Sequence, residues 1–149
     1  MNIIIVGLAR NLEKRITKNV ANLIKAFEKF GEVTFYVVES DSQDSTLYKL
    51  EELTKNFPRF HYKSLGNLEL SFPNRIERLQ YCRNNYVSYI RQIAAQHDFV
   101  CVADLDGINN QLSWSSVGSS FSSNVDWDMC SANQKFGYFD LYALRKKLV

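Results

Sequence analysis

Short aliphatic segments alternate with amphipathic segments up to about residue 104 of this chain. Continuous runs of β-branched and aromatic residues are typical of buried strands, and they predict strands at residues 2–8, 33–38, 60–65 and 98–103. Between them, apolar residues recur with the 3.6-residue period of a helix. This period predicts a helix from Leu12 capped by Asn11, a helix capped by Asp44, and a helix from Arg75 to about Gln96 capped by Asn74.

This order of elements predicts an α/β fold. Strands that alternate with helices form a mostly parallel sheet with helices on both faces, and right-handed crossovers limit the possible topologies. The simplest doubly wound arrangement places the first strand beside the fourth, in the order 3-2-1-4. Ligands bind such sheets beyond the carboxyl ends of the strands at this switch point. We therefore expect residues 9–11 and 104–106 to face one crevice, flanked by residues 39–41.

The amino-acid composition of the sequence changes after Gly107. Residues 108–126 are rich in serine and asparagine, which predicts a loop with a short helix around Trp114–Phe121. Two further strands are predicted, at residues 128–133 and 139–144. At 149 residues, the whole chain corresponds to a single domain.

Composition narrows the functional classes. Lysine and arginine number 18 against 16 acidic residues, a net charge of +2, which does not favour a nucleic-acid binder. No apolar run approaches the roughly 18 residues of a transmembrane segment. The three cysteines cannot all pair within one chain and lack zinc-site spacing, so we expect reduced thiols in a cytoplasmic protein. Peripheral contact with a membrane stays open.

The strongest candidate for chemistry is the pair Asp104 and Asp106, directly after the fourth predicted strand. Residues two apart in an extended segment point the same way, so both carboxylates can face one cation. Mg²⁺ and Mn²⁺ prefer oxygen ligands, and Mg²⁺ is usually held by one or two carboxylates together with phosphate and water. The alternative interpretation is a solvated acidic turn.

Arg83 is predicted to lie on the apolar stripe of the long helix, between Leu79 and Tyr86. An arginine facing the core requires an anionic partner. The partner is either a buried carboxylate or the phosphate or sugar of a ligand in the crevice, and a third possibility is an arginine that reaches water from the edge of the stripe. Asn84 follows Arg83 in the sequence.

The ends of the first two predicted strands carry further polar candidates. Arg10 and Asn11 precede a predicted helix N-terminus, which favours phosphate, although Asn11 also suits a simple cap. Glu39 and Asp41 can accept hydrogen bonds from a ribose or base, or serve turn and cap roles. No GxGxxG motif follows the first strand, which argues against a dinucleotide-binding site.

These motifs, in this order, resemble those of GT-A-fold glycosyltransferases. The segments that carry the resemblance are L-A-R-N at residues 8–11, E-S-D-S-Q-D-S-T at residues 39–46, Arg78 with Arg83-Asn84, and D-L-D-G at residues 104–107. The E-S-D-S-Q-D-S-T segment, and A-N-Q near Asn133, are similar to the capsule-associated α-1,3-mannosyltransferase group and its bacterial relatives.

The resemblance implies a Rossmann-like domain that binds a nucleotide-sugar donor, linked to GDP or UDP. It implies nucleoside contacts from Ala9, Arg10, Glu39 and Asp41, and contacts from Arg83, with Asn84 beside it, to the phosphate or sugar. Asp104 would bind the ribose, and Asp104 and Asp106 would hold Mn²⁺ or Mg²⁺ on the diphosphate.

The implied activity is metal-dependent transfer of a hexose to a hydroxyl of a glycan or lipid-linked acceptor, as in polysaccharide biosynthesis, with Asp104, Asp106 and Arg83 as the catalytic groups. Residues 1–107 would form the nucleotide-binding half, and residues 108–149 the start of an incomplete acceptor half. One alternative is a non-catalytic nucleotide- or glycan-binding domain left by truncation. A metal-dependent phosphoryl-transfer enzyme ranks lower, because phosphatases of the haloacid-dehalogenase type carry D-x-D after the first strand.

Overall fold

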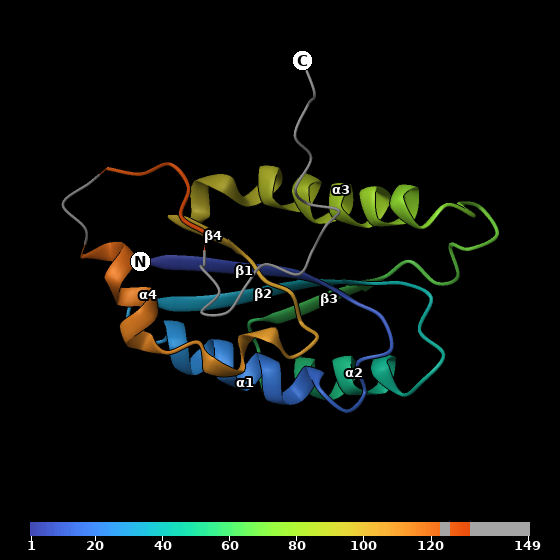
Figure 1. The fold of residues 1–149 in the computed structure, drawn as a ribbon, viewed down its shortest axis with the longest axis horizontal. Helices are drawn as coiled ribbons and strands as arrows, with labels where there is room; N and C mark the ends of the chain where they lie inside the picture. Colours follow the sequence, from blue (N-terminus) through green and yellow to red (C-terminus); the bar gives the residue numbers. More distant parts are fainter. Residues whose placement is uncertain (123–125, 132–149) are drawn as a thin grey trace, which may run out of the picture.

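A computed structural model of the chain describes residues 1–122 and 126–131. It shows a parallel sheet between two layers of helices (Figure 1). The strands are β1 (Asn2–Ala9), β2 (Glu32–Glu39), β3 (Phe60–Ser64) and β4 (Phe99–Val102). The helices are α1 (Ile16–Phe27), α2 (Thr46–Asn56), α3 (Arg75–Ile93) and α4 (Trp114–Phe121), with short 3-10 helices η1 (Ala94–Gln96) and η2 (Ile108–Gln111).

The sheet has the predicted order, β3-β2-β1-β4, with all neighbouring strands parallel. β1 pairs along its whole length with β2, from Asn2 opposite Glu32 to Ala9 opposite Glu39. On its other side, β1 pairs with β4 from Ile3 opposite Phe99 to Val6 opposite Val102. The chain adds β2 and β3 on one side of β1 and then returns to add β4 on the other side. The ends of β1 and β4 therefore form the switch point of a doubly wound sheet.

The two faces of the sheet bury different halves of β1, because side chains alternate along a strand. Ile3 and Ile5 pack in the cluster that includes buried residues of α1 and α2. Ile4 and Val6 pack in a second cluster with Cys82 and Tyr86 of α3. Figure 1 shows α1 and α2 on one side of the sheet and α3 on the other, which confirms the predicted coverage of both faces.

Two elements of the alternating part of the chain differ from the prediction. α1 begins at Ile16, not at Leu12, because residues 12–15 form a turn in which the Leu12 carbonyl accepts from the amides of Arg15 and Ile16. β4 was expected to be buried, but Val100 and Val102 are 47% and 66% exposed. These two side chains share the α3 face with Ile4 and Val6, and within residues 1–122 and 126–131 that face is left open over β4.

The serine-rich region contains the predicted short helix, since α4 spans Trp114–Phe121 and the Ser113 hydroxyl accepts from the amide of Ser116. Residues 128–131 form no strand, and the rest of the predicted strand at 128–133 lies outside the described residues, as does the one at 139–144. Among the helices in the described ranges, none combines the length and apolar character needed to cross a bilayer.

Candidate nucleotide-binding cleft

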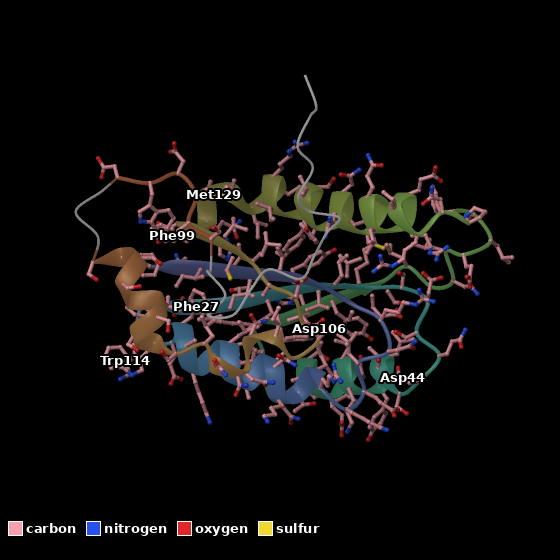
Figure 2. The ribbon with its side chains drawn as sticks, viewed as in Figure 1. Phe27, Asp44, Phe99, Asp106, Trp114 and Met129 are labelled. Atoms are coloured by element: carbon pink, nitrogen blue, oxygen red, sulfur yellow. The ribbon has the colours of Figure 1, made fainter. Side chains whose placement is uncertain are left out.

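A cleft of about 310 Å³ lies at the carboxyl edge of the sheet. It brings together the ends of β1 and β2, the first turns of α3 and the segment after β4, which carries Asp106 (Figure 2). Its charged lining residues are Arg10, Asp41, Arg75, Arg78, Asp104 and Asp106. The expected meeting of residues 9–11 with residues 104–106, flanked by residues 39–41, is therefore present except for Asn11 and Glu39, which do not line the cleft.

The loop after β1 contributes a buried backbone and one exposed cation. Ala9 is buried, and its carbonyl accepts from the amide of Ser40 at 3.3 Å. Arg10 is exposed and lines the cleft. Asn11 adopts a left-handed conformation with φ +53° and does not cap α1, because its side-chain oxygen accepts from the amide of Gln43 at 2.8 Å. The predicted helix N-terminus behind Arg10 is thus displaced by one turn.

The E-S-D-S-Q-D-S-T segment is joined to the loop after β1 by further hydrogen bonds. The amide of Leu12 donates to the Thr46 hydroxyl at 2.6 Å, and the amide of Glu13 donates to Asp44 at 3.1 Å. Asp44 also accepts from the amide of Thr46 at 3.0 Å, but the N-cap residue of α2 is Ser45, so Asp44 lies one residue before the cap position that was predicted for it. Burial opposes ionisation of Asp44, but hydrogen bonds from Thr46 and Glu13 outweigh it and lower its pKa.

Glu39 is a buried carboxylate at the end of β2, with 1% of its surface exposed. It accepts from the amide of Ser42 at 3.1 Å and from the Ser64 hydroxyl at 2.5 Å. These bonds match the turn role that was one of its two interpretations. Glu39 lines a smaller cavity of about 140 Å³, which it shares with Asp41 and with Ser64, Gly66, Asn67 and Glu69.

Asp41 uses both carboxylate oxygens within the protein. One accepts from the amides of Leu68 and Glu69, at 2.8 and 3.1 Å. The other lies 4.0 Å from the Arg78 guanidinium. Asp41 itself has φ +57°, a conformation that the surrounding bonds hold in place. Its carboxylate therefore orders the loop after β3, and the residue also borders the cleft.

The predicted orientation of Arg83 is wrong. The buried residues of α3 are Arg78, Cys82 and Tyr86, spaced four apart, and they face the sheet. Arg83 is exposed and does not line the cleft, and the same holds for Asn84. The stripe that predicted Arg83 also contained Ile76, which is exposed. The buried face lies roughly 90° around the helix from that stripe, at 100° per residue.

Arg78 occupies the place that was predicted for Arg83. Its guanidinium donates to the carbonyls of Phe72 and Pro73 at 2.7 and 2.9 Å, and it lies near Asp41. These contacts satisfy the buried charge and hold the loop that leads into α3, whose predicted cap by Asn74 is present at 2.8 Å. Arg75, one turn earlier, is exposed and lines the cleft.

The D-x-D segment presents its two carboxylates to the cleft. Asp104 and Asp106 are exposed and line it, and Leu105 between them is buried in the core on the α1 side. Gly107 then turns the chain with φ +110°, and the Asp106 carbonyl accepts from Arg15 at 2.8 Å. The turn is thus held by its backbone and by Leu105, which leaves most of the carboxylate oxygens free.

Gly7 allows the D-x-D segment to approach β1. A methyl group at this position would lie 2.6 Å from the Ala103 carbonyl oxygen and 2.9 Å from the Leu105 side chain. Sequence reasoning noted only that no GxGxxG motif follows the first strand, and it did not single out Gly7. Its packing role has no local signal, since Gly7 contacts residues about a hundred positions away. Arg75 was also missed, because the residue lies before the predicted apolar stripe.

The donor set suits a hard divalent cation that is completed by its substrate. Two carboxylates with free oxygens line the same cleft, and Mg²⁺ is often bound by one or two carboxylates plus phosphates and water. Within residues 1–122 and 126–131, no cluster of three or more His, Cys, Asp or Glu side chains could form a complete protein cage. The residues present therefore fit a metal that arrives with a diphosphate.

Two ionisable side chains that are neutral at pH 7, Cys82 and Tyr86, lie close to the charged residues of the cleft. The Cys82 thiol lies 3.4 Å from the Ser40 hydroxyl, and burial raises its pKa. Burial also raises the pKa of Tyr86, with a further contribution from Asp104 that Arg83 opposes. Both groups are protonated at neutral pH. Cys82, Cys101 and Cys130 are free thiols, as expected, although Cys130 is exposed and Cys101 is only partly buried.

Comparison with protein families and curated proteins gives no match to a family model and no match to a curated protein. Among solved structures, the chain is similar to residues 1–349 of S. aureus TarS, a glycosyltransferase, in complex with UDP, at 26% identity and a TM-score of 0.50. A second structure of the same TarS segment matches at 27% identity and a TM-score of 0.49.

Both matches cover 71% of this chain and 28% of the TarS chain. The chain therefore spans little more than a quarter of the protein it resembles. The similarity supports a glycosyltransferase-like, Rossmann-like α/β fold, and it does not extend to the mannosyltransferase group named from the sequence motifs.

Proposed function

We propose that the chain forms the nucleotide-binding part of a glycosyltransferase that uses a nucleotide-diphosphate sugar and a divalent metal. The observation that carries the proposal is the cleft at the switch point of the sheet. The D-x-D carboxylates line this cleft together with Arg10 and Arg75. Acidic groups for a metal and basic groups for phosphates are the complementary halves of a diphosphate site.

The carboxylates of Asp104 and Asp106 would hold Mn²⁺ or Mg²⁺ against the diphosphate. When bound, the metal would supply positive charge that stabilises the departing nucleoside diphosphate. The exposure of both carboxylates fits this role, because few protein donors compete for their oxygens. Asp104 is also the proposed ribose ligand, as the family resemblance implies.

Arg10 and Arg75 are the favoured phosphate ligands. Both are exposed in the cleft, and no ion pair engages either of them among the described residues. Arg78 is directed to backbone carbonyls, so it supports the cleft wall instead. The role of Arg83 in donor binding, with Asn84, stays a prediction from the resemblance, and its exposed position on α3 does not favour it.

The nucleoside would lie near Ala9, Glu39 and Asp41. Ala9 and Asp41 border the main cleft, and Glu39 and Asp41 border the adjoining cavity, which is lined by residues of the loop after β3. A flat base would fit at such a boundary between two loops. The carboxylates of Glu39 and Asp41 are already used in hydrogen bonds within these loops. The UDP bound to the similar TarS structure favours a UDP-linked donor over a GDP-linked one.

The transferred group would be a hexose, and the acceptor a glycan or lipid-linked hydroxyl, as the resemblance implies. A cytoplasmic location remains a prediction from the free thiols. A non-catalytic nucleotide-binding domain is the second candidate, because the chain matches only 28% of the TarS structure. Binding and turnover distinguish the two candidates.

The test is calorimetric titration with UDP and GDP, in Mn²⁺ and in EDTA. We expect UDP to bind in Mn²⁺ and to lose roughly 10- to 100-fold in affinity in EDTA or in Asp104→Asn/Asp106→Asn, since contacts to charged groups contribute about 1.5–3 kcal/mol. Asp128→Asn, an exposed aspartate outside the cleft, is the control and should bind like the wild type. Equal affinity with and without Mn²⁺ would exclude the metal role.

A second measurement addresses catalysis. Release of UDP from UDP-hexoses, with and without soluble glycan acceptors, should be detectable and should disappear in Asp104→Asn/Asp106→Asn. Metal-dependent UDP binding without any release of UDP would instead identify the chain as a binding domain.

A further inference from the structure

Four lysines form a line along the side of α1 that faces away from the sheet, and we call this line the ridge. Ile16, Val20, Leu23 and Phe27 face the sheet and are buried. Positions 14, 18, 25 and 29 lie on the opposite side of the helix or of the turns at its ends, because they are separated by four, seven and four residues. All four are exposed lysines: Lys14, Lys18, Lys25 and Lys29.

These four charges have no acidic partner among the described residues. The ion pairs found there join Lys49 to Glu52, Lys55 to Glu51, Arg59 to Glu32 and Arg78 to Asp41. Glu28 is the one acidic residue between Lys14 and Lys29. The ridge therefore carries a local excess of positive charge in a chain whose net charge is only +2.

Two exposed apolar side chains border the ridge. Trp114, at the start of α4, is 51% exposed, and the Lys29 ammonium lies 4.2 Å from the centroid of its ring. Ile108, in η2, is 57% exposed, and η2 is tied to α1 by a 3.3 Å hydrogen bond between Asn22 and Asn110. Figure 2 shows Trp114 on α4, on the α1 side of the sheet.

We propose that this surface, formed by the four lysines with Trp114 and Ile108, binds the surface of an anionic lipid bilayer. Lysines near such a surface each strengthen binding by about fivefold. Tryptophan is enriched at the level of the lipid headgroups, where its ring is apolar and its N–H is polar. A nucleic acid would use the same charges but would gain little from an exposed isoleucine beside them.

The surface runs along α1 from one edge of the sheet to the other. Trp114 lies near the amino edge of the sheet, since it contacts Lys29 just before β2. Lys14 and Ile108 lie at the carboxyl edge, where the amide of Ile108 donates to Asp106 at 3.3 Å. A bilayer against the outer side of α1 would therefore bring the D-x-D segment close to the lipid headgroups.

The test is co-sedimentation of the protein with vesicles of phosphatidylcholine alone and of phosphatidylcholine mixed with phosphatidylserine. We expect binding to the mixed vesicles only, and weaker binding as the salt concentration rises. Lys18→Gln/Lys25→Gln should lower the affinity roughly 25-fold, from two lysine contributions. Trp114→Ala should lower it several-fold, and far-UV circular dichroism should show both variants folded.

The matched control is Lys63→Gln/Arg91→Gln, which removes the same charge. Arg91 is exposed on α3, and Lys63 bonds to Asn85 of α3, on the other side of the sheet. This variant should bind the mixed vesicles within about twofold of the wild type. An equal loss in the control, equal binding to phosphatidylcholine alone, or binding to duplex DNA as tight as to the mixed vesicles would overturn the proposal.

Discussion

The two polar segments that meet at the cleft use their side chains differently. In the segment of residues 39–46, side chains of Glu39, Asp41, Ser42, Asp44 and Thr46 all accept hydrogen bonds from backbone amides. In the D-x-D segment, Asp106 accepts one amide at 3.3 Å, and the segment is otherwise held by its backbone carbonyls and by Leu105. The first segment is internally bonded, and the second keeps its charges free.

The difference shows why similar polar strings at strand ends have different functions. A carboxylate that already accepts two or three amide hydrogen bonds is fixed in place and has few lone pairs left for a ligand. A carboxylate on a turn that is anchored by a neighbouring leucine is positioned without using its own oxygens. We therefore expect substitutions in residues 39–46 to affect folding and substitutions of Asp104 and Asp106 to affect binding.

The largest expected effect on stability is at Leu105, the buried side chain that anchors the D-x-D turn without carrying charge. Leu105→Ala should lower the free energy of unfolding by about 2–5 kcal/mol, because it removes a buried core side chain. Urea denaturation measures the change. The control is Leu70→Ala, at a leucine that is 88% exposed, with an expected change within about 0.5 kcal/mol. Similar small changes in both variants would show that the core does not hold the turn.

The next effect concerns Asp41. Asp41→Ala should lower the free energy of unfolding by about 1–3 kcal/mol, since the amides of Leu68 and Glu69 and the Arg78 guanidinium lose their acceptor. Glu69→Ala removes a carboxylate from the same loop but keeps the backbone bond, so it should be nearly neutral. A stable Asp41→Ala variant that fails to bind UDP would instead identify Asp41 as a ligand residue.

A smaller effect is expected at Asp44, with a defined pH dependence. Asp44→Ala should cost about 1 kcal/mol at neutral pH, the usual cost of losing such a helix-start bond. The folded state lowers the pKa of Asp44 below 3.8, so this stabilisation is present above that pH and is lost as the pH falls through the folded pKa.

Denaturation of the wild type and Asp44→Ala at a series of pH values measures this difference. It should shrink towards zero in strong acid. Ser45→Ala is the control, because the Ser45 side chain makes no capping bond. A difference that does not change with pH would mean that the bonds do not depend on the charge of Asp44.

The smallest effect on stability is expected at Asp106. Asp106→Asn should change the free energy of unfolding by less than about 0.5 kcal/mol, and the metal-free variant should melt at or above the wild-type temperature. The reason is that removal of one charge relieves repulsion from Asp104. Thermal melts without metal check this expectation, and a large drop in melting temperature would assign Asp106 a structural role.

Sequence reasoning located the elements of the cleft but not the partners of every side chain. It predicted that residues 9–11 and 104–106 would meet, because parallel strands end at the same edge of a sheet, and all of these except Asn11 line the cleft. It placed Arg83 on the sheet-facing side of α3, where the structure has Arg78. An apolar stripe is about 100° wide, so residues at its margins cannot be assigned to the core from their spacing alone.

The sequence by itself determined the strand order and the identity of the chemical groups at the strand ends. Local periodicity and right-handed crossovers leave few arrangements for alternating strands and helices. Only the tertiary structure decided which of those groups are free. Whether Asp41 or Asp106 has spare lone pairs depends on amides brought close by folding, such as those of Leu68 and Glu69 for Asp41. Such contacts join residues far apart in the chain and have no local pattern.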